Sequence, residues 1–111
     1  MTEEGRPQKF RVTVRGVFQG LAADQRAALL AGAAAHDVLF VGRFSKDGTF
    51  TYGRDLFAFT FGFDLAASGP DAETDVATEA EVRAMDRLEA GAWGYRNLRT
   101  SVSRVPEPRR R

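Results

Sequence analysis

The sequence predicts an α+β domain in which a four-stranded antiparallel sheet carries two helices on one face. Three observations support this prediction. Extended segments alternate between apolar and polar residues, as strands with one buried face do. Two segments, 21–37 and 71–90, have the composition and the apolar spacing of helices. The order along the chain is strand, helix, strand, strand, helix, strand.

The first strand is predicted at KFRVTVRGVF, residues 9–18. Bulky apolar residues share one parity in this segment: Phe10, Val12, Val14 and Phe18. Arginine and threonine take the other parity, at Arg11, Thr13 and Arg15. One face of this strand is therefore expected in the core and the other outside it. The alanine-rich segment 21–37 follows as a helix that ends near His36.

A second strand is predicted at VLFVGRFS, residues 38–45, because the segment is rich in β-branched and aromatic residues. Asp47-Gly48 then suits the turn of a hairpin. The following extended stretch, 49–65, changes parity part-way along. Its aromatic residues are even-numbered at Phe50 and Tyr52 and odd-numbered afterwards, at Phe57, Phe59, Phe61 and Phe63. We favour a β-bulge at residues 53–55, with the 41–52 hairpin projecting beyond the sheet, and the alternative is a second reversal that adds a strand.

The second helix is predicted after Pro70, a residue that suits the first turn of a helix. An i, i+4 apolar stripe continues it, and Gly91 ends it. The stripe consists of Val76, Ala80, Ala84 and Leu88. The last strand, LRTSVSRV at 98–105, has charges on both faces, which is typical of an edge strand. A single domain over residues 9–105 is expected, between flexible tails at 1–8 and 106–111.

With right-handed crossovers, this order of elements gives the ferredoxin-like βαββαβ sandwich, with strand order 4-1-3-2. The odd-numbered phenylalanines of the third strand are then expected under the helices. The opposite face of the sheet has a floor of small residues flanked by arginines. It comprises Arg11, Thr13, Arg15, Ala58, Thr60, Gly62, Arg99, Ser101 and Ser103.

Composition excludes several classes of function. The chain of 111 residues has no cysteine and one histidine, so neither a thiolate centre nor a histidine-based metal site is expected. No phosphate loop, dinucleotide fingerprint or HExxH motif is present, and no cofactor is expected. The net charge is +1 and the phenylalanines take the buried parity, which argues against nucleic-acid binding. Without a secretory signal or a long apolar run, we expect a cytoplasmic protein with no membrane partner.

The arginine-flanked face is the first candidate site. Arg11, Arg15 and Arg99 are candidate ligands for an acidic or phenolic small molecule, above the small side chain of Thr60. The structural alternative is a face that is solvated or covered by a second subunit. Trp93 and Tyr95 lie in a glycine-flanked loop, which is either a lid that contacts ligand or an aromatic plug over the core.

Candidate catalytic residues are fewer. His36 is the only side chain with an ordinary pKa near neutrality, so it is a candidate general base, although a histidine at a helix C-terminus is also stabilised by the helix dipole. Tyr52, Arg54 and Asp55 lie at the change of parity. Bulges occur near active sites, and these groups are able to polarise a carbonyl or accept a proton. The alternative is an Arg–Asp turn with a packed tyrosine.

The segments FRVTVRGVF, GLAADQRAALLA, HDVLF, GTFTYGRDLFAFTF and GYRNLR resemble a small actinobacterial family described only as a domain of unknown function. The resemblance covers about residues 10–105. It implies a bacterial cytosolic protein and no particular activity. Abundant arginine and alanine and the absence of isoleucine are also typical of a GC-rich genome.

A looser similarity is to dimeric ferredoxin-like barrels, in which two sheets enclose a ligand and some members are cofactor-independent cyclases or monooxygenases. From the arginine-flanked face we derive a first hypothesis. In this hypothesis the protein is a homodimer that binds a small molecule of bacterial metabolism, including specialised metabolism. If it is an enzyme, it is a cofactor-independent cyclase or isomerase that acts on an acidic or aromatic substrate. The alternative hypothesis is a non-enzymatic homodimeric assembly module.

Overall fold

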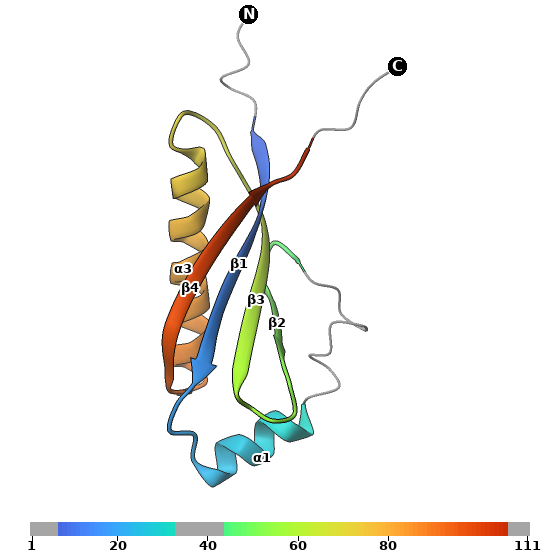
Figure 1. Ribbon diagram of the computed structural model, residues 1–111, viewed down its shortest axis with the longest axis vertical. Coiled ribbons are helices and arrows are strands. Elements are labelled where there is room, and N and C mark those ends of the chain that lie inside the picture. The colour runs from blue at the N-terminus through green and yellow to red at the C-terminus, as the bar shows by residue number, and fades with distance from the viewer. Residues whose placement is uncertain (1–6, 33–43, 107–111) are drawn as a thin grey trace, which may run out of the picture.

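The computed structural model describes residues 7–32 and 44–106. Six elements lie in these two ranges: β1 (Gln8–Phe18), α1 (Ala23–Ala31), β2 (Thr49–Tyr52), β3 (Ala58–Ala67), α3 (Ala72–Ala90) and β4 (Tyr95–Arg104). The four strands form one antiparallel sheet in the order β2-β3-β1-β4, and α3 runs along one face of it (Figure 1). The predicted α+β class is confirmed, and the topology is consistent with a ferredoxin-like fold.

The central strands carry the core because apolar residues alternate along both of them. In the β1–β3 register, Val12 lies opposite Phe63 and Val14 opposite Phe61, and all four side chains are fully buried. The helix α3 covers this face with the predicted i, i+4 stripe, and its buried residues are Ala72, Val76, Ala80, Ala84 and Leu88. Small alanines let the helix backbone approach the sheet closely, so the phenylalanines supply most of the core volume.

The short helix α1 lies across one end of the sheet, beside the connection between β2 and β3 (Figure 1). Leu29 is its one buried residue within the described range. Two side-chain hydrogen bonds hold it there: the Tyr52 hydroxyl donates to the Leu29 carbonyl at 2.6 Å, and the Gln25 amide donates to the Ala92 carbonyl at 2.7 Å. The helix is therefore held by polar contacts at its two ends more than by apolar burial.

The change of parity in the segment 49–65 is a chain reversal. The bulge that the sequence favoured is wrong, because β2 and β3 pair antiparallel, with Phe50 opposite Phe61 and Tyr52 opposite Phe59. The reversal includes Leu56, whose φ is 55° and whose N–H donates to the Gly53 carbonyl at 3.0 Å. An antiparallel return allows even-numbered and odd-numbered aromatic residues to share one face, so no bulge is needed to bury them all.

Phe57 departs from the expected row of buried phenylalanines. Its side chain is 59% exposed, whereas Phe59, Phe61 and Phe63 are buried. The residue lies at the end of the reversal, where its N–H donates to the Asp55 carboxylate and its carbonyl accepts from the Phe18 N–H. These bonds fix the backbone just before the regular alternation begins, which explains why parity alone misplaced the ring.

The strand predicted at 38–45 lies mostly outside the described residues, and so does the predicted end of the first helix near His36. Within the described part, Ser45 forms an isolated parallel bridge with Phe63. Its N–H donates to the Gly62 carbonyl, and its carbonyl accepts from the Asp64 N–H at 2.8 Å. The chain therefore reaches the β3 edge at Ser45, turns, and enters β2 at Thr49.

The core assignment predicts different costs for two neighbouring phenylalanines. Replacing the buried Phe59 with alanine is expected to lower the free energy of unfolding by about 3–5 kcal/mol, because it removes a large ring and leaves a cavity. Phe57→Ala is the matched control and is expected to cost less than about 1 kcal/mol, because that ring is largely in solvent. Urea unfolding of both variants checks this, and equal losses would contradict the observed reversal.

Candidate functional site

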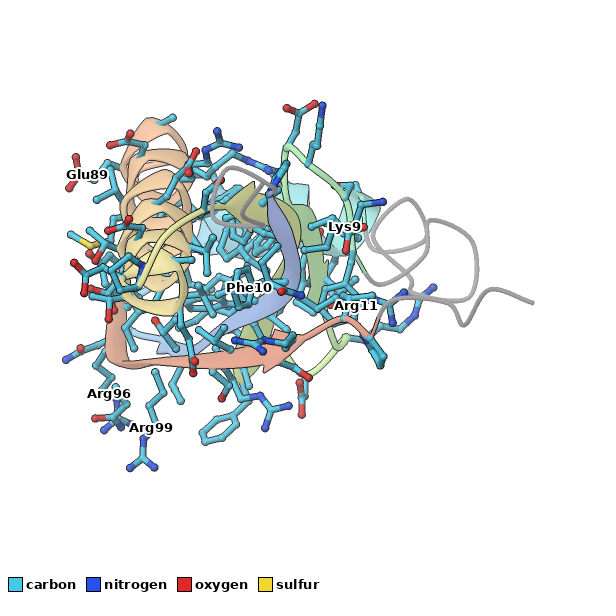
Figure 2. The ribbon with its side chains drawn as sticks, turned by 90° about the horizontal axis from the view of Figure 1, so that it is seen from above. Lys9, Phe10, Arg11, Glu89, Arg96 and Arg99 are labelled. Carbon is cyan, nitrogen blue, oxygen red and sulfur yellow. The ribbon has the colours of Figure 1, made fainter. Side chains whose placement is uncertain are left out.

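The face of the sheet away from α3 is here named the open face. Its side chains come from β1, β3 and β4: Arg11, Thr13, Arg15, Ala58, Thr60, Gly62, Asp64, Arg99, Ser101 and Ser103. Figure 2 shows Phe10 directed toward α3, whereas Lys9 and Arg11 lie on the opposite side of β1. The predicted division of residues between the two faces is therefore observed, and the arginines stand on the face without a helix.

A hollow of about 410 Å³ lies where β1 begins and β3 ends. Its lining residues are Lys9, Phe10, Arg11, Lys46, Asp64, Leu65, Ala66 and Val105. The apolar part of the lining includes Ala66 and Val105. Phe10 and Leu65 also border the hollow, but they are 1% and 9% exposed and their side chains belong to the core, so they contribute little beyond their backbone. Three cationic groups and one carboxylate surround this apolar part. The hollow thus combines an apolar base with a positively charged rim.

Arg11 joins the hollow to the open face. Its Nε atom lies 3.7 Å from an Asp64 carboxylate oxygen, and both side chains are about half exposed. The guanidinium also lies over the Phe44 ring, with its central carbon 5.2 Å from the ring centroid. The two contacts orient the guanidinium on its Nε side and on one face. They leave its terminal nitrogens, which form the fork that binds carboxylate or phosphate, without a partner among the described residues.

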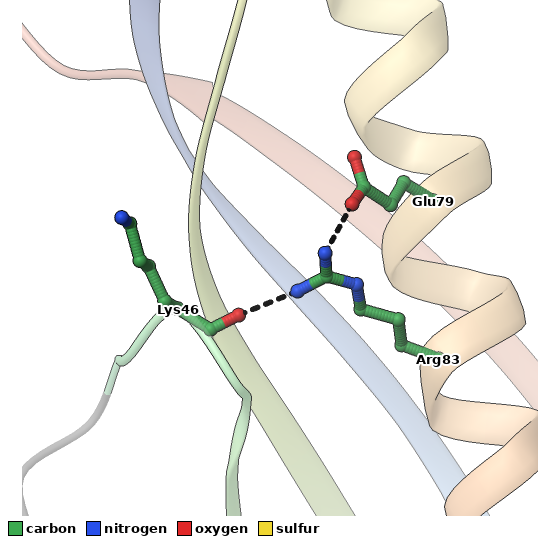
Figure 3. Close-up of polar contacts among 3 residues, drawn as sticks. All are labelled: Lys46, Glu79 and Arg83. Atoms are coloured by element: carbon green, nitrogen blue, oxygen red, sulfur yellow. Dashed lines mark hydrogen bonds and ion pairs between the residues drawn. The ribbon is translucent and has the colours of Figure 1, made fainter.

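Lys46 is positioned by a loop that α3 holds in place. The Arg83 guanidinium donates to the Lys46 carbonyl at 2.8 Å and also pairs with Glu79 (Figure 3). One turn further along, Arg87 donates to the carbonyls of Asp47 and Gly48. Figure 3 shows the Lys46 carbonyl facing Arg83 and the ammonium group directed away from α3. Backbone contacts on one side of the loop therefore place a cation on the other side.

Gly48 is required by the geometry of the same loop. Its φ is 95°, in the left-handed region that favours glycine. A Cβ atom at this position would lie 2.4 Å from the Phe63 ring, which is closer than packing allows. The Arg87 guanidinium stacks nearby, 5.4 Å from the Phe61 ring centroid, and so combines cation–π contact with its hydrogen bonds. The loop that carries Lys46 is therefore tied both to the core and to α3.

The predicted ligand residues Arg15, Thr60 and Arg99 lie farther along the open face, outside the hollow. Arg15 is the direct neighbour of Thr60 on β3 and of Arg99 on β4. Arg15 and Arg99 are both exposed, and neither has a carboxylate within ion-pair distance among the described residues. Two like charges directly opposite each other destabilise a sheet. This arginine pair is therefore a second positively charged feature, separate from the hollow.

The predicted catalytic residues are not brought together with either feature. The Tyr52 ring lies on the α3 side of the sheet, and burial raises the pKa of its hydroxyl. Arg54 and Asp55 are exposed in the reversal between β2 and β3, and the Asp55 carboxylate accepts the Phe57 N–H at 3.2 Å. His36 lies outside the described residues. Tyr52 and Asp55 therefore make structural hydrogen bonds and form no site with Arg54.

Trp93 and Tyr95 also lie on the α3 side. The Trp93 ring stacks on Phe50, with centroids 5.2 Å apart, and both Trp93 and Tyr95 are half-buried against the core. Tyr95 is the β4 neighbour of Phe18. The sheet therefore separates both side chains from the arginines of the open face. Their contacts correspond to the aromatic plug that the sequence offered as an alternative to a lid.

Sequence reasoning missed Lys9 and Lys46, although the chain contains a signal for them. These are the only lysines in a chain with 16 lysine and arginine residues in total, and both line the hollow. The two residues are distant in sequence, and the loop geometry that brings Lys46 to the start of β1 is a tertiary property. The sequence shows that the chain has only two lysines, but only the fold shows that both line the same hollow.

The described residues, 7–32 and 44–106, contain neither a cluster of metal-ligating side chains nor a long apolar helix. No three histidine, cysteine, aspartate or glutamate side chains in these ranges lie close enough together to hold a metal ion. Neither described helix combines the length and the apolar character needed to cross a membrane.

These features define a small α+β domain with an uncovered sheet face and a cationic hollow at one end of the sheet. The chain belongs to a family of unknown function, DUF6204, whose match spans residues 2–110. Comparison with curated proteins and with solved structures gives no match.

The loop contacts predict a stabilising role for Arg87. Arg87→Met keeps much of the apolar stem but loses both carbonyl contacts and the cation–π contact, so we expect a loss of about 1–2 kcal/mol in unfolding free energy. Amide exchange at Gly48, whose N–H donates to the Ser45 carbonyl, is expected to accelerate. Arg26→Met, on the exposed surface of α1, is the control and should change neither quantity. Unchanged exchange at Gly48 would show that α3 does not hold the loop.

The position of Tyr52 predicts a dependence of stability on alkaline pH. Burial raises the pKa of the hydroxyl above its ordinary value of 10.0, so folding favours the neutral form. This contribution is complete below the unfolded pKa and is lost as the pH rises through the folded pKa. Tyr52→Phe is expected to cost about 1 kcal/mol at neutral pH through the lost bond to Leu29. The difference from the unsubstituted protein should narrow above about pH 10. Urea unfolding across this range checks it, and a constant difference would contradict the burial effect.

Proposed function

We propose that this protein binds a small organic acid in the hollow between Lys9, Arg11 and Lys46. The observation that carries the proposal is the combination of an apolar base with a cationic rim. Three positive groups face one carboxylate, Asp64, which leaves two positive charges in excess. An anion with an apolar body, such as an aromatic carboxylate or an aryl phosphate, matches both parts of the hollow.

The use of lysine in this chain supports the same ligand class. Lys9 and Lys46 are the only two lysines of the chain, and the other 14 of its 16 lysine and arginine residues are arginines. Lysine presents a compact charge on a flexible stem, whereas arginine presents a rigid fork. Arg11 therefore fixes the direction from which an acidic group binds. The flexible ammonium groups of Lys9 and Lys46 are able to adjust to that group from two other sides.

The hollow is also organised before any ligand binds. The β1–β3 pairing fixes the backbone of Lys9 and Arg11, and Arg83 fixes the backbone of Lys46. A binding group that is already in position loses less conformational entropy when the ligand arrives. The Arg83 and Arg87 contacts therefore contribute to affinity through the loop, and neither arginine lines the hollow itself.

The proposal narrows the hypothesis drawn from the sequence. Of the three arginines in that hypothesis, Arg11 alone lines the hollow. A homodimer stays a proposal, and ligand binding in the hollow does not require it. A cyclase or isomerase activity gains no support from the contacts of Tyr52, Arg54 and Asp55, so binding alone is proposed. The abundance of arginine and alanine and the absence of isoleucine support an actinobacterial origin, and the cytoplasmic setting expected from the sequence stays a proposal.

Titration with 2-naphthoate and phenyl phosphate tests the proposal. Calorimetry is expected to show saturable binding at one site, and 2-naphthamide, the uncharged isostere, is expected not to bind. Ligand at about 100 times its dissociation constant should stabilise the fold by about 2.7 kcal/mol, seen as a raised melting temperature. The bound acid should also protect Lys9 and Lys46 from an amine-reactive reagent, as mass spectrometry of the peptides shows directly.

Arg11→Met and Lys46→Met are each expected to weaken binding roughly tenfold or more, because each removes a charge-assisted contact. Arg99→Met is the matched control, since it removes a cation from the open face outside the hollow, and its affinity should equal that of the unsubstituted protein. Equal losses in all three variants would indicate nonspecific attraction to positive charge. No binding by either acid would reject the proposal and favour the assembly-module alternative.

A further inference from the structure

The exposed surface of α3 opposite its buried stripe carries a regular row of side chains, here named the outer stripe. It consists of Asp75, Val82, Asp86 and Glu89. The spacing of seven residues between Asp75, Val82 and Glu89 places them one above another on the helix. Val82 is 51% exposed, so the stripe is acidic with an apolar residue at its centre. Figure 2 shows Glu89 directed outward from this helix.

The basic residues of α3 do not neutralise this stripe. Arg83 pairs with Glu79 and donates to the Lys46 carbonyl, and Arg87 donates to the carbonyls of Asp47 and Gly48. Both guanidiniums are thus turned toward the 46–48 loop. The three carboxylates of the outer stripe have no cationic partner among the described residues.

The open face has the complementary properties. Arg15 and Arg99 stand side by side across β1 and β4, without a carboxylate partner among the described residues. Figure 2 shows Arg99 projecting away from the sheet. The floor beside the pair is made of short side chains: Thr13, Ala58, Thr60, Gly62 and Ser101. Such a floor allows a helix to approach, and the arginine pair supplies the charge that an acidic helix lacks.

We propose that the open face binds the outer stripe of α3 from a second copy of this chain. In that contact Val82 lies over the floor of short side chains, and the carboxylates of the stripe meet Arg15 and Arg99. Helix against sheet is the ordinary way in which an uncovered sheet face is buried. A face-to-face contact of two open faces would instead bring the Arg15–Arg99 pairs of both copies together, which like-charge repulsion opposes.

The contact is heterologous, because the two surfaces differ and point in opposite directions from one subunit. The outer stripe and the open face lie on opposite sides of one copy. A pair of copies joined by one such contact therefore still has an unused open face at one end and an unused outer stripe at the other. A contact of this type repeats and builds open-ended columns unless the rotation closes a ring. The contact is centred on Arg15 and Arg99, which do not line the hollow, so separate variants test this proposal and the ligand-binding proposal.

Sedimentation velocity of the full chain at several protein concentrations tests the proposal. At about 20 mM salt the average mass is expected to rise with concentration, and at about 500 mM salt the protein should sediment as a monomer, because exposed charges are then screened. A monomer under both conditions, up to millimolar protein, would overturn the proposal.

Charge reversal identifies the two surfaces. One variant, Arg15→Glu/Arg99→Glu, has an acidic open face, and the other, Asp75→Lys/Asp86→Lys/Glu89→Lys, has a basic outer stripe. Each alone is expected to be monomeric, since its two surfaces then carry the same sign. An equimolar mixture is expected to assemble at low salt, because each surface of one variant complements a surface of the other.

Two results of this experiment would overturn the proposal. A mixture that stays monomeric excludes the pairing of these surfaces. Assembly of the second variant alone would show that the outer stripe is not needed, and would indicate contact between two open faces. All five substitutions are at exposed positions, and circular dichroism of each variant establishes that it is folded before the sedimentation is interpreted.

Discussion

The structure depends on the burial of one row of phenylalanines beneath α3. Phe59, Phe61 and Phe63 are almost wholly removed from solvent, and Phe50 stacks on Phe61 from the neighbouring strand, with centroids 4.7 Å apart. Because successive side chains of a strand point to opposite faces, fixing this row under the helix also fixes the residues between them on the other side. The open face and its arginines follow from that single constraint. A shift of one residue in the register of β3 would disrupt the core and the open face together.

Much of the fold was predictable because its signals are local. Alternation in β1, the i, i+4 stripe of α3 and the order of elements were enough to give the fold class and the central position of β1 and β3. The strand beside β3 was misplaced, because β2 is formed by residues 49–52, which the sequence had assigned to the third strand. The reversal between Tyr52 and Ala58 was not predictable with the same certainty, because a bulge and a reversal produce the same change of parity. The choice depends on whether Phe50 and Phe61 meet across two strands, which is a tertiary contact. The exposure of Phe57 was missed for a related reason: the residue lies at the end of the reversal, before the regular alternation of β3 begins.

The site was less predictable than the fold because it is assembled from distant segments. The sequence identified Arg11, Arg15 and Arg99 as one positively charged face, and the sheet register agrees with that grouping. It did not identify the hollow, because Lys46 is placed beside the start of β1 by a loop that Arg83 and Arg87 hold. The interpretation of Trp93 as part of a lid rested on the flanking glycines. Flanking glycines indicate only that the backbone is free to move. The stacking of Trp93 on Phe50 is a tertiary contact that the local sequence does not show.

The distribution of charge gives this nearly neutral domain two different surfaces. Six of its 15 acidic residues lie on α3, whereas Arg15 and Arg99 stand without a carboxylate partner among the described residues on the sheet. The two arginines of α3 hold the loop of Lys46. If those arginines faced solvent, the outer stripe would be neutralised and the loop would lose its anchor. One arrangement of Arg83 and Arg87 therefore has two consequences: it places a cation at the hollow and leaves the helix acidic. The position of Lys46 at the hollow and the acidic character of the helix surface therefore both depend on these two side chains.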